Sequence, residues 1–86
     1  MNEKEARIQK CLEWLSLQTP IKTINKRHDS SIYKHMVEKY YGNGFYLPRE
    51  DFIEAAKISK ILFKQAKGSL WLAISEKTLK KIKGYY

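Results

Sequence analysis

The spacing of apolar residues changes once along this chain, near Ile61, and this change constrains the fold more than any other feature. Before it, apolar side chains recur every three or four residues, which is typical of amphipathic helices. After it, the β-prone runs 61–65 and 70–74 surround a turn at residues 66–69 that contains a glycine. The sequence therefore predicts a mostly helical α+β fold, in which three helices precede a two-stranded hairpin.

Helix boundary signals place the three helices. The first covers about residues 3–18 and ends before Pro20, because proline cannot continue the helical hydrogen bonds. The other signals are N-cap oxygens, glycines after a helix and proline with acids in a first turn. They predict a second helix at about residues 30–41 and a third from Pro48, with a short extended connector at residues 21–25.

A short fourth helix follows the hairpin. Ser75 can cap it, and Leu79 and Ile82 would face the core. Three helices followed by a two-stranded hairpin resemble the order of a winged helix-turn-helix. A length of 86 residues accommodates one domain, residues 1–86, with one modest core.

Cysteine content and hydropathy indicate the compartment. Cys11 is the only cysteine, which excludes an internal disulfide and a multi-cysteine zinc site; it lies on the apolar stripe of the first helix. Residues 1–5 are polar and acidic, unlike a signal peptide, and no apolar run approaches the roughly 20 residues of a membrane span. We expect a cytoplasmic protein of a bacterial host cell that contacts no membrane and uses no metal or cofactor.

The net charge of +8 is distributed unevenly. Residues 57–86 hold eight lysines and one glutamate, so this third carries most of the excess. Lysines suit phosphate contacts better than the reading of base edges, although an acidic protein partner or a merely solvated surface would also fit. The predicted contact residues are Arg49, Lys57, Lys60, Lys64, Lys67, Lys77, Lys80, Lys81 and Lys83.

The aromatic residues divide into two predicted groups. Those at apolar positions are expected in the core: Tyr33, Tyr40, Phe45, Phe52, Phe63 and Trp71. Others are expected to be partly exposed, where they could stack bases or anchor a protein interface: Trp14, Tyr41, Tyr46, Tyr85 and Tyr86.

Lys34, His35 and Glu38 are the candidates for chemistry, because they share one face of the second predicted helix. In an acid/base set, His35 would carry the proton and Glu38 would orient it. Alternatively, Lys34 and Glu38 form a surface ion pair beside a solvated histidine. Because no other residue points to a pocket around them, we expect a binding protein and not an enzyme.

One segment resembles a known group of proteins. Residues 31–38 (SIYKHMVE), Gly42, Tyr46 and residues 51–56 (DFIEAA) resemble small uncharacterised proteins of phages and mobile elements. The resemblance covers residues 31–56 with looser likeness on either side, and departs at residues 47–50. It implies a mobile-element accessory protein. Such settings hold transcription regulators and inhibitors of host defence enzymes, including anti-CRISPR proteins.

Two functions are therefore expected as alternatives. The first is a winged-helix-like DNA- or RNA-binding protein, with the third helix near a groove and the lysines of the hairpin and last helix on phosphates. The second is a phage-encoded, anti-CRISPR-like inhibitor that binds a bacterial defence protein or its nucleic-acid complex. A small ribonuclease that uses His35 is a third alternative.

Overall fold

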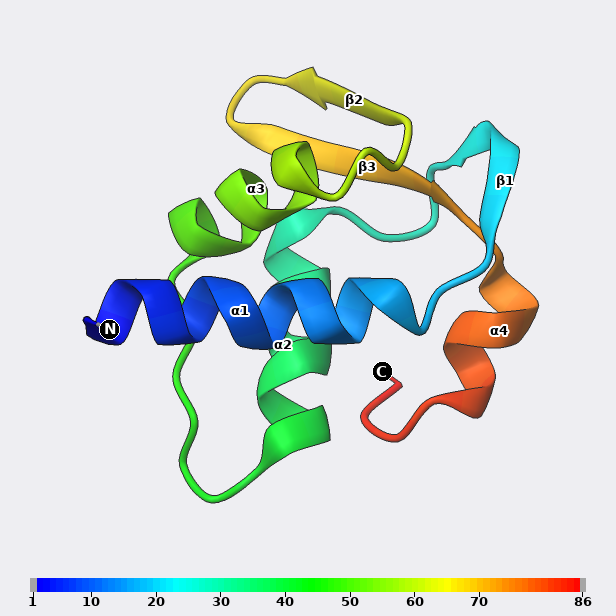
Figure 1. Cartoon of the computed structure of the whole chain (residues 1–86). Helices are drawn as coiled ribbons and strands as arrows, with labels where there is room; N and C mark the ends of the chain where they lie inside the picture. The colour runs from blue at the N-terminus through cyan, green and yellow to red at the C-terminus, as the bar shows by residue number, and fades with distance from the viewer. Residues whose placement is uncertain (1, 86) are drawn as a thin grey trace.

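The computed structural model describes residues 2–85, which form four helices and one three-stranded antiparallel sheet (Figure 1). The fold is α+β, and none of the helices in the described part is long and apolar enough to cross a membrane. In chain order the elements are α1 (Glu3–Ser16), β1 (Pro20–Asn25), α2 (Ser30–Tyr41), α3 (Arg49–Ile58), β2 (Phe63–Ala66), β3 (Ser69–Ile74) and α4 (Glu76–Lys81).

The core is built around three aromatic rings, one from each of the first three helices. Trp14 of α1, Tyr33 of α2 and Phe52 of α3 are all buried, and their ring centroids lie 5.7 to 6.2 Å apart. Ala55 and Ala56 of α3 are also fully buried. The prediction of a partly exposed Trp14 was wrong, because α3 packs across α1 and leaves only 1% of this residue exposed.

The sheet has one more strand than the sequence predicts. Its order is β1-β3-β2, so β3 is central and pairs with both neighbours in antiparallel fashion. The connector after the first helix becomes β1 because it pairs with β3, about fifty residues further along the chain. Pro20 stands at the first position of this edge strand, where a residue without an N–H group is tolerated.

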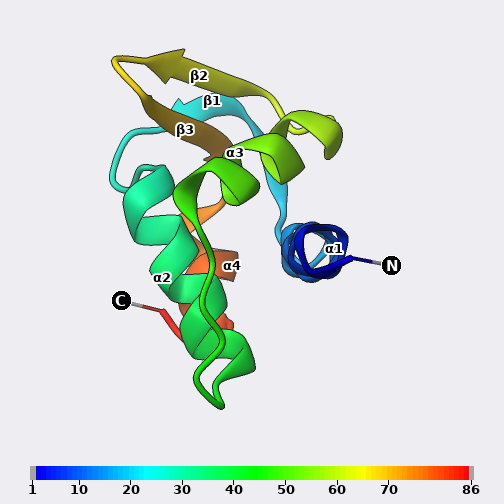
Figure 2. The ribbon, with the colours of Figure 1, turned by 90° about the vertical axis from the view of Figure 1, so that its left-hand side faces the viewer.

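All four helices lie on one side of the sheet, and Figures 1 and 2 agree that no helix covers the other face. The alternation of β3 explains this arrangement. Leu70, Leu72 and Ile74 are buried against the helices, and the residues between them point the opposite way. Among residues 2–85, the sheet therefore has one face packed against the helices and one open face that no helix covers, although the small side chain of Ala73 is buried there too.

The hairpin turn is a two-residue loop, Lys67 and Gly68, closed by the pair Ala66 and Ser69. Both loop residues have positive φ, 51° and 79°, as a type I′ turn requires. This turn matches the right-handed twist of the strands, and glycine adopts its second position without strain. The turn predicted at residues 66–69 is confirmed.

Candidate functional site

The open face of the sheet carries a shallow pocket of about 310 Å³. Lys26, Lys64, Ala66 and Trp71 line it. Lys64 of β2 is the direct cross-strand partner of Trp71 on β3, and Lys26 directly follows β1. The indole of the central strand is thus flanked by one lysine from each side of the sheet.

Strand alternation explains why Trp71 lies here and not in the core. Its neighbours Leu70 and Leu72 are fully buried, so Trp71 points to the opposite face and is only partly covered. The sequence predicts Trp71 and Phe63 as core residues, and the structure differs for both, since Phe63 is 37% exposed. Residues 70–74 are all apolar, so the sequence carries no alternation of apolar and polar residues that could have placed Trp71 on the open face.

Two further cations gather at the tip of the hairpin. Lys67 is the first residue of the turn, and the guanidinium of Arg49 lies 3.9 Å from where a Cβ on Gly68 would stand. Arg49 begins α3, so tertiary packing brings it to a turn almost twenty residues away. Among residues 2–85, none of Lys26, Arg49, Lys64 and Lys67 forms an ion pair.

The other predicted lysines lie elsewhere. Lys57 and Lys60 are exposed at the C-terminal end of α3. α4 follows the end of β3 that is opposite the hairpin turn, about 20 Å away for a six-residue strand (Figure 1). The last predicted contact residues are there: Lys77, Lys80 and Lys81 on α4, and Lys83 beyond its end. The lysines that the sequence groups into one basic end are therefore divided between the hairpin, the end of α3 and α4, and the hairpin and α4 groups lie at opposite ends of β3.

The exposed side of α3 is not basic. Its exposed residues are Arg49, Glu50, Glu54, Lys57 and Ile58, so two positive charges stand beside two negative ones. Glu54 is also paired with Lys4 of α1, at 3.4 Å between Oε1 and Nζ. A helix with this balance has no charge preference for the phosphates that border a groove.

The exposed aromatic residues have individual contacts. Tyr46 is 66% exposed, with the Lys34 ammonium 5.2 Å from its ring centroid. Tyr41 is partly buried, and its hydroxyl donates to the backbone carbonyl of Lys10 at 2.9 Å. Tyr85 is partly buried as well, whereas Tyr86 lies outside the described residues.

The Lys34, His35 and Glu38 group is an ion-paired cluster on α2. Lys34 Nζ lies 3.3 Å from Glu38 Oε2 and His35 Nδ1 lies 2.9 Å from Glu38 Oε1. The backbone N–H of Leu47 also donates to Glu38 Oε2 at 2.8 Å. Burial by itself would raise the pKa of Glu38, but these hydrogen bonds outweigh it and hold the pKa below its ordinary value. Glu38 therefore fastens the loop before α3 to α2.

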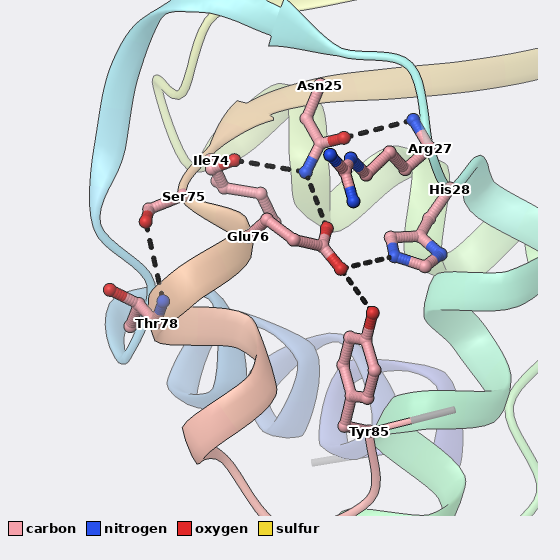
Figure 3. Close-up of polar contacts among 8 residues, drawn as sticks. All are labelled: Asn25, Arg27, His28, Ile74, Ser75, Glu76, Thr78 and Tyr85. Atoms are coloured by element: carbon pink, nitrogen blue, oxygen red, sulfur yellow. Dashed lines mark hydrogen bonds and ion pairs between the residues drawn. The ribbon is translucent and has the colours of Figure 1, made fainter.

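A second carboxylate network is centred on Glu76 of α4 and joins the end of β1 and the loop after it to the C-terminal segment (Figure 3). Glu76 Oε1 accepts from Asn25 Nδ2 at 3.0 Å, while Oε2 contacts His28 Nε2 at 3.1 Å and accepts from the Tyr85 hydroxyl. Burial would raise the pKa of Glu76, yet the hydrogen bonds from Tyr85, Asn25 and His28 lower it to about 2. The sequence did not single out this group, because Asn25 and His28 lie about fifty residues before Glu76.

These geometries differ in what they can do chemically. Both Glu38 and Glu76 are carboxylates whose oxygens are already engaged, so they hold segments together. Within the described residues, no group of three or more His, Cys, Asp or Glu side chains could hold a metal ion. The Trp71 pocket combines an accessible ring with unpaired cations.

No family model, curated protein or solved structure matches this chain.

Proposed function

We propose that this protein binds nucleic acid, with the phosphates held by cations of the hairpin end. The observation that carries the proposal is the open pocket in which Lys26 and Lys64 flank Trp71. Arg49 and Lys67 extend this positive surface to the hairpin tip. A cation that forms no ion pair with the protein can neutralise a phosphate and release its counterion, which is the main source of sequence-independent affinity.

The order of elements supports a winged-helix arrangement as part of this proposal. Three helices precede the hairpin, and in this proposal α2 and α3 would serve as the two helices of the helix-turn-helix. The connection between α2 and α3, residues 42–48, is longer than the usual three to four residues. Because the exposed side of α3 is balanced in charge, we place the principal contacts on the hairpin and not on that helix.

Equilibrium binding across a salt series tests the proposal. A fluorescently labelled oligonucleotide would be titrated with wild type and with a triple variant, Lys26→Gln, Lys64→Gln and Lys67→Gln. Each lost phosphate contact lowers the slope of log affinity against log salt by about 0.7 to 0.9, so the triple variant should flatten the slope by about two. The matched control removes three charges from α4, through Lys77→Gln, Lys80→Gln and Lys81→Gln.

The control variant should flatten the slope less than the triple variant does, because α4 lies at the other end of β3 and would add only long-range attraction. Equal flattening by both variants would assign binding to net charge and not to the hairpin. If neither DNA nor RNA bound the wild type at low salt, the proposal would be rejected.

Exposed apolar side chains favour a second candidate function, the binding of a protein. Leu17 and Ile58 are 45% and 53% exposed. Each is next in sequence to a residue that lines a pocket of about 300 Å³ between α1, the start of β1 and residues 59–61. Large exposed apolar residues around a hollow are typical of protein interfaces. An inhibitor of a bacterial defence effector would use such a surface, and it would not bind free nucleic acid.

A further inference from the structure

The open sheet face has a composition that indicates which form of nucleic acid it suits. We propose that the Trp71 pocket takes an unpaired base of a single-stranded nucleic acid, stacked on the indole. Lys26 and Lys64 would hold the phosphates on either side of that base. This inference rests on the proposed nucleic-acid binding and specifies its ligand.

The pocket has the size and openness that one base requires. Its volume of about 310 Å³ is at the lower end of the range for small-molecule sites. It lies on the face of the sheet that none of the helices in residues 2–85 covers (Figure 2). Neighbouring strands lie about 4.8 Å apart, so the backbones that bear the two lysines are about 10 Å apart with Trp71 between them. Flexible lysine side chains can reach phosphates on both sides of a stacked ring.

A duplex does not satisfy this arrangement. Bases inside a duplex are stacked on one another and present only their edges in the grooves, whereas an aromatic side chain stacks on the face of a base. Base stacking on aromatic residues beside a positive surface is the usual way in which single strands are bound without sequence preference. The ring of Trp71 is therefore functional only toward a base that has left its stack.

The same face offers a path for the rest of the strand. Lys64 and Ala66 alternate along β2 and so point to the side of Trp71. Leu62 directly precedes β2, and its carbonyl extends the pairing by accepting from Ala73 N–H at 2.9 Å. Leu62 is 57% exposed and provides an apolar contact next to the pocket. At the other end, Lys67 and Arg49 provide cations for further phosphates. Among the residues that line the pocket, none is acidic, which disfavours a basic protein segment as the occupant.

Substitution of Trp71 separates stacking from charge. Binding of an unstructured single-stranded oligonucleotide of about 12 nucleotides, as oligo-dT and as oligo-U, would be compared with that of a duplex of equal length. Trp71→Leu should lower single-strand affinity roughly 5- to 150-fold, the range expected for one base–aromatic stack, and leave duplex affinity unchanged. Trp71→Phe retains a ring and should stay closer to wild type.

Phe63→Leu is the matched control, because Phe63 is an aromatic residue of the same hairpin that points to the opposite face. It should leave single-strand affinity unchanged. Circular dichroism and thermal unfolding of each variant would establish that the sheet is intact. In the Trp14→Phe variant, where Trp71 is the one remaining tryptophan, single strands should quench its fluorescence and duplex should not.

The outcomes are distinguishable. If wild type bound duplex as tightly as single strands, and Trp71→Leu had no effect while the lysine triple variant still lost affinity, the stacking inference would fail and nucleic-acid binding would stand. If no oligonucleotide bound at all, both would fail. A preference of oligo-dT over oligo-U, or the reverse, would assign the single strand as DNA or RNA.

Discussion

At the scale of single residues, burial determines which groups can react. Cys11 is fully buried in the core, and burial, with the nearby Asp51 carboxylate, raises the pKa of its thiol to about 12. It acts as a small core residue, as its place on the apolar stripe predicts. Glu76 is the opposite case, a carboxylate kept ionised by hydrogen bonds from Asn25, His28 and Tyr85.

Glu76→Gln should remove part of the acid sensitivity of the fold. The pKa of Glu76 is about 2 in the folded protein and near 4.5 in the unfolded chain, so its contribution to stability is present above about pH 4.5 and is lost as pH falls toward 2. Urea unfolding should show the variant less stable than wild type near neutral pH, with the gap closing as pH approaches about 2. Glu50→Gln is the control and should show no such gap, because Glu50 is exposed and forms no ion pair among residues 2–85. A gap that stays constant with pH would show that the charge of Glu76 is not what holds the network.

At the scale of elements, the chain after α4 is fixed against α2 by close backbone contact. A Cβ on Gly84 would lie 2.7 Å from the Met36 carbonyl oxygen and 2.9 Å from the Tyr40 nitrogen, so only glycine fits. This contact positions Tyr85 to donate to Glu76. The C-terminal half of α2, the segment after α4 and the Glu76 network therefore form one unit.

Gly84→Ala should destabilise this unit more than the matched change Gly44→Ala. Both glycines have positive φ, 98° and 76°, so each substitution carries the left-handed penalty of about 1 to 2 kcal/mol. A Cβ on Gly44 meets no atom within 4 Å, whereas one on Gly84 meets backbone, which should add at least about 1 kcal/mol. Free energies of unfolding in urea measure both. Equal losses would mean that the C-terminal segment moves aside without cost.

At the scale of the whole molecule, charge is divided between two basic regions at opposite ends of β3. The hairpin region includes the Trp71 pocket, while the α4 region holds Lys77, Lys80 and Lys81, with Lys83 beyond the helix end. Long-range attraction depends on the total charge, and the lifetime of a complex depends on its contacts. The two regions should therefore affect binding kinetics in different ways.

Stopped-flow binding should separate the two effects. Replacing Lys77, Lys80, Lys81 and Lys83 with Gln lowers the net charge from +8 to +4, which should slow association with nucleic acid and leave dissociation within about twofold. The hairpin triple variant should instead accelerate dissociation by about tenfold or more. The opposite assignment, with fast dissociation only in the α4 variant, would move the binding site to the last helix.

The sequence by itself determined the helices, the hairpin and its turn, because these depend on local periods and local capping. α2 lies at residues 30–41 as predicted, and Asp29 and Ser75 accept the N-cap hydrogen bonds of α2 and α4. It also determined that the chain is basic and that Tyr46 is exposed. These features need no information about which distant segments meet.

Tertiary structure decided everything that depends on long-range pairing. Residues 20–25 carry no strong strand pattern and become a strand only because β3 offers an edge to pair with. That pairing brings Lys26 beside Trp71, and the packing of α3 brings Arg49 to the hairpin tip while it buries Trp14. Because all helices cover one face of the sheet, the tryptophan in the middle of an apolar run is left on the open one.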